Sequence, residues 1–228
     1  MECINYNKLY SLQDKVMKLI FSVEHEFYLT GGTCLSRFYQ EKRYSDDLDF
    51  FTNNSTRFGF AVKNIKTKLL ENFSLTTEVE SKDFIRFEID RLLQLDFVND
   101  RVPRYKDVIV LNNGYIIDNI ENILSNKITA IIGRDNPKDI FDIYLICKFY
   151  EFDWQEILEA SRSKAFFNHD DLIVRLKSFP HSLLKSINII DIDFLQNFTN
   201  EFPLIVEEIN SKEKHIATKI RKQTLDRK

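Results

Sequence analysis

A pair of adjacent glycines constrains this chain more than any other sequence feature. Glycine is scarce, with five in 228 residues, yet Gly31 and Gly32 stand side by side after an apolar run. Such a pair marks a place where the backbone passes close to another group or adopts a conformation that other residues avoid. Residues 29–51 read LTGGTCLSRFYQEKRYSDDLDFF, so an acidic cluster follows the glycines closely.

The pattern around the glycines predicts a strand, a turn and a helix. Residues 26–30 are expected to form a short strand, and residues 33–42 a helix with Thr33 as its N-cap. The backbone N–H groups of Gly31, Gly32 and Thr33 would then lie without side-chain bulk at the positive end of a helix dipole. The segment predicts either a site for nucleotide phosphates or a tight turn that binds no ligand.

An acidic strand is expected next. Residues 46–52 alternate, so that Asp47 and Asp49 project from one face while the apolar residues between and after them enter the core. Two carboxylates held this close repel each other unless a proton or a cation lies between them. Hard oxygen ligands suit Mg²⁺ or Mn²⁺. The alternative is a solvated strand edge, and we assign that role to Asp46.

A third carboxylate is expected from a neighbouring strand. Residues 75–79, 84–89 and 93–98 have strand character, and Asp96 lies inside the last of these runs, where an aspartate is otherwise depleted. We therefore expect Asp96 to complete a metal site or to act as a base.

The distribution of patterns predicts an α+β fold in two parts. A mixed α/β domain with a small mixed or antiparallel sheet is expected over residues 1–118, and a helical domain packed against it over residues 119–228, with a ligand cleft between them. The first part adds helices over 6–23 and 60–70 and a short strand over 114–118. Helices are expected in the second part over 119–133, 137–150, 153–165, 169–178 and 192–210.

This combination resembles the nucleotidyltransferase superfamily typified by DNA polymerase β, whose signature is a Gly-Gly or Gly-Ser turn, a short helix and an Asp-apolar-Asp/Glu strand. Fourteen residues separate Gly32 from Asp47, slightly more than is usual there. The detailed sequence of this segment resembles the AbiEii/AbiGii toxin family, whose motif is GGTxL, then a helix, then R-x-S-x-D-[LI]-D-[FL]. That second pattern is matched by Arg43, Ser45, Asp47, Asp49 and Phe50.

The resemblance continues in the helical half. The family carries a K-x-x-A segment, an arginine and [RK]-D-[IL]-[YF]-D, matched here by Lys127, Ala130, Arg134 and residues 138–142. Lys127 also lies on the apolar stripe of its own helix, where an ammonium is costly unless its side chain reaches solvent or meets an anion. We interpret Lys127 as a contact for nucleotide phosphate, with a solvent-reaching side chain as the alternative.

Two acids follow that lysine in the family pattern. Asn136 and Pro137 predict a helix start, which places Asp139 in the first turn, where the helix dipole favours a carboxylate. Asp142 lies deeper among apolar residues, and we favour it as the functional acid. The pair is suited to holding Lys127 or a base in place.

The resemblance implies an enzyme that transfers a nucleoside monophosphate from an NTP to an acceptor and releases pyrophosphate. The expected acceptor is RNA, at the 3′ end of tRNA, and the protein would act as the toxin of a bacterial toxin–antitoxin or phage-defence system with a cognate antitoxin as partner. The catalytic set is Asp47, Asp49, Asp96, Lys127 and Asp142, and the first three hold the metal. The nucleotide-binding set is Gly31, Gly32, Thr33, Arg43, Ser45, Lys127 and Asp139.

Two other functions stay open at this point. One is a nucleotidyltransferase that modifies small molecules of the antibiotic kind. The other is a regulatory protein that binds nucleotide without catalysis. The intact pair of Asp47 and Asp49 favours an active enzyme, because a binder needs fewer carboxylates near phosphate.

Composition adds limits on partners and location. The net charge of −3 gives no global basic field for nucleic acid, although a local patch would suffice. Residues 212–228 carry seven Lys or Arg against two acids. This excess of positive charge predicts either a solvated helix end or an RNA contact. No apolar run approaches the roughly 18 residues that span a bilayer. The three cysteines form no CxxC motif, which favours reduced thiols and the cytoplasm.

Overall fold

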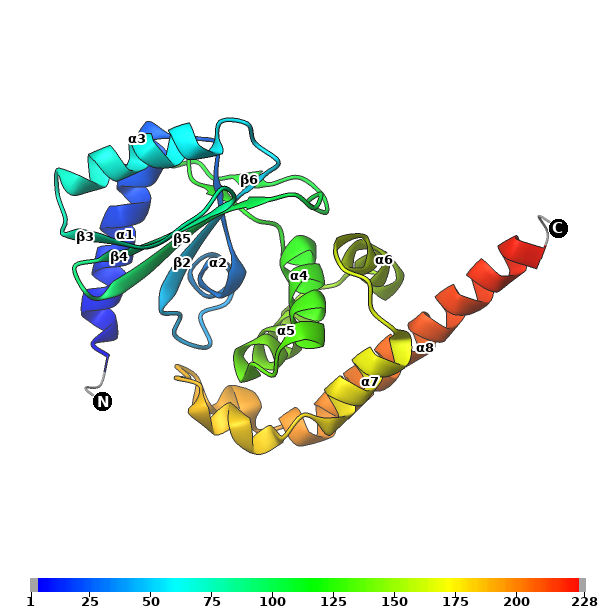
Figure 1. The fold of residues 1–228 in the computed structure, drawn as a ribbon. Coiled ribbons are helices and arrows are strands. Elements are labelled where there is room, and N and C mark those ends of the chain that lie inside the picture. The colour runs from blue at the N-terminus through cyan, green and yellow to red at the C-terminus, as the bar shows by residue number, and fades with distance from the viewer. Residues whose placement is uncertain (1–3, 226–228) are drawn as a thin grey trace. The chain divides into compact units, whose positions relative to one another are not determined.

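The computed structural model describes residues 4–225, with side chains described as far as Lys212. The chain divides into two compact units, one ending at Asn119 and the other beginning at Ile120 (Figure 1). A mixed α/β part followed by helices agrees with the predicted fold class. The domain limits of 1–118 and 119–228 stay a prediction.

The first unit alternates helices and strands. Its elements are α1 (Tyr6–Val23), β1 (Tyr28–Thr30), α2 (Gly31–Phe38), β2 (Asp47–Asn53), α3 (Phe58–Leu70), β3 (Leu75–Glu80), β4 (Phe84–Ile89), β5 (Leu93–Asp100), β6 (Ile109–Val110) and β7 (Ile116–Ile117). The strands form one mixed sheet in the order β3-β4-β5-β2-β1-β7-β6. Strands β2 and β5 run parallel, as do β1 and β7, whereas the other neighbours are antiparallel. The acidic strand β2 therefore lies in the middle of the sheet.

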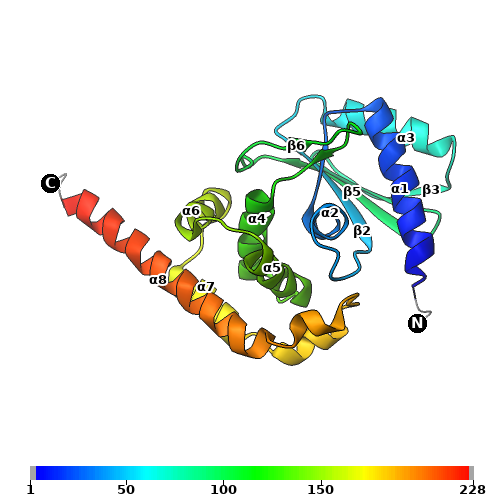
Figure 2. The same ribbon diagram turned by 180° about the vertical axis from the view of Figure 1, so that it is seen from behind.

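An aromatic core fixes the acidic strand from its apolar side. Phe50 is fully buried, and its ring lies 5.5 Å from that of Phe21 in α1 and 5.7 Å from that of Phe97 in β5. Phe27 contacts both Phe97 and Phe58 of α3. Helices α1 and α3 lie side by side in this unit, as both views show (Figures 1 and 2). Because truncating such a phenylalanine costs about 3–5 kcal/mol, this core holds β2 firmly.

The second unit is helical. It contains α4 (Ile120–Gly133), α5 (Pro137–Phe149), α6 (Trp154–Lys164), α7 (His169–Ser178), two 3₁₀ helices, η1 (His181–Ser186) and η2 (Ile192–Leu195), and α8 (Phe198–Leu225). Helix α4 packs against α5, α6 and α7 and is the centre of the unit. Residues 212–228 were predicted as a solvated helix end or an RNA contact. Apart from Lys212, their side chains lie outside the described part of the structure.

Several elements differ from the prediction. Helix α2 begins at Gly31 with Thr30 as its N-cap, so Thr33 is not the cap that the sequence suggested. The pattern over 192–210 contains a 3₁₀ helix, η2, and then α8, which starts only at Phe198 and accommodates Pro203 in its first turns. The short strand β6 was not predicted. Within residues 4–225, no helix is long and apolar enough to cross a membrane.

Candidate active site

The glycine turn joins β1 directly to α2. Gly31 has φ +70°, a left-handed conformation, and is also the first residue of the helix. Helix geometry leaves the first backbone N–H groups without partners inside the helix, so those of Gly31, Gly32 and Thr33 are suited to an anion. The hydroxyl of Thr30 does not cap them, because it donates to Asp118 Oδ2 at 2.5 Å.

The two glycines are needed because charged side chains approach them. A Cβ on Gly31 would lie 2.6 Å from Asp49 Oδ2. A Cβ on Gly32 would lie 2.3 Å from Arg43 Nη2 and 3.2 Å from Ser45 Oγ. Both distances to the charged groups are shorter than real Cβ contacts, so no other residue fits without displacing them. The bare backbone therefore brings a helix start beside one carboxylate and one guanidinium.

The acidic strand presents its carboxylates as the alternation predicted. Asp47 and Asp49 are half-buried on one face of β2, and Leu48 and Phe50 are buried on the other. The hydroxyl of Thr33 donates to the backbone carbonyl of Asp47, which ties the first turn of α2 to the start of β2.

Asp96 lies beside Asp49 but is already engaged. The two are directly paired in the parallel ladder between β2 and β5, so their side chains share a face. Arg86 of β4 donates to both oxygens of Asp96, from Nε at 2.8 Å and from Nη2 at 2.7 Å, and Gln94 Nε2 donates at 3.2 Å. The hydrogen bonds to Asp96 raise the pKa of the Arg86 guanidinium, and the charge of Asp49 acts in the same direction.

The donor set fits a divalent cation only in part. Asp47 and Asp49 are oxygen ligands two residues apart on one strand face, the chemistry that Mg²⁺ and Mn²⁺ prefer. Among the described side chains, no three acids, histidines or cysteines lie together as a metal site. At the third predicted position, Arg86 pairs with both oxygens of Asp96. The structure thus offers a pair of ligands, with a third held in an ion pair.

Arg43 and Ser45 lie under the glycine turn. Each is only 2% exposed. Arg43 Nη1 donates to the carbonyl of Tyr44 at 2.9 Å, and Ser36 Oγ donates to the carbonyl of Arg43 at 2.7 Å. This burial favours a role in shaping the turn over one of reaching out to a ligand.

Several side chains that the sequence analysis did not single out hold the segment between α2 and β2. Tyr6, Tyr10 and Gln13 of α1 each bond to residues 44–46, and Arg37 of α2 bonds to Gln13. Gln13 had a signal in the sequence, because a glutamine at position 13 interrupts the apolar stripe of the first predicted helix.

In the helical unit, Lys127 meets both predicted acids. Its Nζ lies 2.8 Å from Asp139 Oδ1 and 2.7 Å from Asp142 Oδ2, and the two carboxylates are 0% and 1% exposed. Arg134 adds two hydrogen bonds to Asp139, at 2.7 and 3.0 Å. The cost of an ammonium on an apolar helix face is thereby offset by two buried anions.

Asn136 caps α5 through its side chain and Pro137 follows as the first helical residue, as predicted. Burial opposes ionisation of Asp139, but the charges of Lys127 and Arg134 and their hydrogen bonds outweigh it and lower the pKa of that carboxyl. Asp139 is therefore an anion at neutral pH and a firm partner for Lys127.

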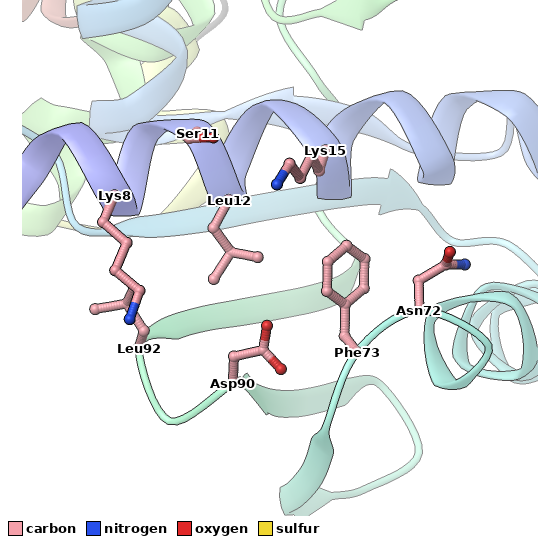
Figure 3. Close-up of a pocket in the computed structure, with 8 residues that line it drawn as sticks. All are labelled: Lys8, Ser11, Leu12, Lys15, Asn72, Phe73, Asp90 and Leu92. Atoms are coloured by element: carbon pink, nitrogen blue, oxygen red, sulfur yellow. The ribbon is translucent and has the colours of Figure 1, made fainter.

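A surface pocket lies elsewhere in the first unit. Its volume is about 520 Å³, and Lys8, Lys15 and Leu12 of α1 line it together with Phe73 and Asp90 (Figure 3). None of the predicted site residues lines this pocket. We therefore place the candidate active site at the glycine turn and the acidic strand, and not at this pocket.

Comparison with known proteins agrees with this geometry. Residues 20–201 match the family model described as nucleotidyl transferase AbiEii toxin, Type IV TA system. The chain belongs to this family. It is therefore a nucleotidyltransferase, as the resemblance of its motifs implied.

Relatives of the AbiEii family member described here are distant in sequence. An uncharacterized protein of Aquifex aeolicus, aq_aa25, is 28% identical over 172 residues, which cover 71% of this chain and 75% of that protein. The crystal structure of JHP933 from Helicobacter pylori has a TM-score of 0.56 at 20% identity and covers 96% of this chain and 97% of its own. MenT4, a nucleotidyltransferase toxin from Mycobacterium tuberculosis, has a TM-score of 0.51 at 12% identity over 91% of this chain and 93% of its own. At these identities the structures support the fold.

Proposed function

We propose that this AbiEii family member is a metal-dependent nucleotidyltransferase that acts as the toxin of a bacterial toxin–antitoxin system. The proposal rests on the approach of the Gly31 backbone to the carboxylate of Asp49, where a Cβ would lie 2.6 Å from Oδ2. That approach joins an anion-binding helix start to an acidic strand, and the chemistry of nucleotide transfer needs both.

In this proposal Asp47 and Asp49 hold Mg²⁺ or Mn²⁺. The bound metal would neutralise charge on the phosphates and polarise the phosphorus–oxygen bond. Asp96 completes the ligand set or acts as the base, and either role requires that Arg86 gives up at least one of its two bonds to that carboxylate.

The backbone N–H groups of Gly31, Gly32 and Thr33 receive the β- and γ-phosphates of the NTP. An acceptor hydroxyl oxygen forms a bond to the α-phosphorus, the bond from that phosphorus to the β-phosphate oxygen breaks, and pyrophosphate leaves. The hydroxyl proton passes to Asp96. Arg43 and Ser45 support the turn from beneath, since both are buried against Gly32.

Lys127, together with Asp139 and Asp142, is proposed to contact nucleotide phosphate, as the family pattern implies. The two acids fix its ammonium in place. The acceptor is proposed to be RNA, at the 3′ end of tRNA, the site of action the cytoplasm, and the partner a cognate antitoxin. The family description as the toxin of a type IV system supports the last point.

A transfer assay tests this function. The purified protein is incubated with tRNA, Mg²⁺ and each NTP labelled at its α-phosphate, and we expect label on the RNA. Asp47→Asn and Asp49→Asn should each abolish transfer, whereas Asp107→Asn, which changes a fully exposed acid of the same unit, should leave it intact. Absence of label on any RNA with any NTP would count against the RNA acceptor.

The same variants separate the alternatives. Label on an aminoglycoside and not on RNA would identify a small-molecule nucleotidyltransferase. A regulatory nucleotide binder would keep its effect on cell growth after Asp47→Asn, because binding alone does not need that carboxylate.

A further inference from the structure

We infer that helix α1 sets the position of the two halves of the active site, with Gln13 and Tyr10 as positioning residues for the transfer reaction. This inference rests on the proposed function for its catalytic consequence. Its structural basis lies entirely in the first unit and uses residues 6–13 of α1, which precede the start of the family match at residue 20.

Gln13 joins the two halves directly. It is a polar side chain at 0% exposure in the middle of α1. Its Nε2 donates to the carbonyl of Ser45 at 3.0 Å, and its Oε1 accepts from Arg37 Nη1 at 2.9 Å. Arg37 belongs to α2, the helix that begins with the glycine turn, whereas Ser45 lies two residues before Asp47. One amide group therefore links the proposed phosphate site to the proposed metal site.

Tyr10 completes the same link with its ring and its hydroxyl. The hydroxyl oxygen accepts from the backbone N–H of Ser45 at 3.1 Å, so both backbone polar groups of that residue are held by α1. The guanidinium carbon of Arg37 lies 4.3 Å from the centre of the Tyr10 ring, which adds a cation–π contact to the bond between Arg37 and Gln13.

Tyr6 holds the residues on either side of Ser45. Its ring stacks on that of Tyr44, with centroids 3.9 Å apart and planes 13° from parallel. Its hydroxyl donates to Asp46 Oδ1 at 2.8 Å. Side chains of α1 thus contact all three residues: Tyr6 contacts Tyr44 and Asp46, and Tyr10 and Gln13 bond to Ser45. Asp46, which the sequence suggested was a solvated strand edge, is part of this attachment.

The contacts explain why the attachment matters for catalysis. The peptide of Ser45 leads directly into β2, and Thr33 of α2 bonds to the carbonyl of Asp47. Loss of the bonds from Tyr10 and Gln13 removes both attachments of the Ser45 backbone to α1 and leaves the contacts of Tyr6 with Tyr44 and Asp46, so Asp47 can shift relative to the first turn of α2. A displacement of about 1 Å in a catalytic group can lower a rate by about 100-fold.

Two variants test the inference. Tyr10→Phe removes one acceptor and keeps the ring over Arg37, and Gln13→Met removes both amide bonds at nearly constant volume. Tyr28→Phe is the matched control, because it deletes a tyrosine hydroxyl that bonds to Asn53 at the opposite end of β2 from Asp47. Each variant is measured by hydrogen exchange of residues 44–47, by nucleotide Kd and by kcat for transfer.

We expect faster exchange of residues 44–47 in both variants, a kcat lowered by about tenfold and an unchanged nucleotide Kd, with the control at wild-type values. A combined double variant of Gln13 and Tyr10 should lose less than the product of the two single effects, because both act on Ser45. Unchanged exchange would overturn the inference, and so would faster exchange with unchanged kcat.

A wild-type protein without transfer activity would contradict the proposed function separately. Binding of Mn²⁺ alone then decides the inference. Weaker Mn²⁺ binding in Tyr10→Phe, at unchanged thermal stability, would support control of Asp47 and Asp49 by α1, and unchanged Mn²⁺ binding would refute it.

Discussion

Alanine substitutions at four glycines separate the two physical reasons for a glycine at the turn. At Gly31 the φ of +70° and the close approach of Asp49 both oppose a side chain. Gly114 has a φ of +83° but open space around a Cβ, and Gly32 has the close approach of Arg43 without a left-handed φ. Gly59, in α3, has neither constraint. The four positions therefore form a complete set of controls within one chain.

The expected changes in unfolding free energy follow from these two terms. A left-handed conformation costs alanine roughly 1–2 kcal/mol, which is the expected loss at Gly114. Overpacking costs about 1–3 kcal/mol, which is the expected loss at Gly32. Gly31→Ala should lose roughly the sum, about 2–5 kcal/mol. Gly59→Ala should gain up to about 1 kcal/mol, because alanine has the lower entropy cost in a helix.

Urea unfolding of the four variants measures these differences, and a transfer assay at a temperature where all four are folded measures their effect on activity. We expect Gly31→Ala and Gly32→Ala to lose activity although they are folded, since Asp49 and Arg43 must move aside. Gly59→Ala and Gly114→Ala should retain it. Equal stability of Gly31→Ala and Gly114→Ala would refute the reasoning, because the approach of Asp49 would then have no energetic consequence.

Three further predictions concern buried charges. Arg86→Met should strengthen Mn²⁺ binding, measured by titration, because it removes the guanidinium from both oxygens of Asp96 beside Asp49; weaker binding would show that Arg86 supports the site. Lys127→Met should destabilise the protein by about 3–5 kcal/mol in urea unfolding, because the buried carboxylates of Asp139 and Asp142 both lose the ammonium of Lys127, and the added change Asp142→Asn should recover part of that loss. The lowered pKa of Asp139 means that its ionised form stabilises the fold above the unfolded pKa of about 3.9, and that this stability disappears as pH falls through the folded pKa. Asp139→Asn should therefore be less stable than wild type at pH 7 and lose less stability on acidification below about pH 4; parallel pH profiles of the two proteins would contradict this.

Local patterns predicted most of the elements. Helix α1 and strand β4 have the predicted bounds, 6–23 and 84–89, because hydrophobic periodicity is strong in both. The start of α2 was placed two residues late. Thr33 looks like a cap, but its hydroxyl bonds to the carbonyl of Asp47, a contact that only the folded chain provides. The residues near Thr33 in the sequence do not show that its hydroxyl bonds to a distant carbonyl instead of capping the helix.

The partners of the site residues depended on pairings between distant segments. Asp96 was singled out from its strand, but its position beside Asp49 follows from the parallel pairing of β2 with β5, which sequence periodicity does not specify. Arg86 could have been predicted as the partner of Asp96, since it lies opposite Asp96 in a hairpin of two adjacent predicted strands. Gln13 could also have been predicted as a buried polar contact, because the reasoning that singled out Lys127 on an apolar helix face applies equally to Gln13.

The order of the strands in the sheet has a consequence during synthesis of the chain. Strand β1, which carries the glycine turn, has β2 on one side and β7 on the other. Strand β2 in turn needs β5 as its second neighbour. A nascent chain that has the glycine turn and both aspartates outside the ribosome still lacks β5 until residue 100 and β7 until residue 117. These non-local pairings form slowly because a long loop must close first. Incomplete translation products that end between β5 and β7 therefore contain Asp47, Asp49 and Asp96, but β1, the strand that leads into the glycine turn, has β2 as a neighbour and lacks β7 on its other side.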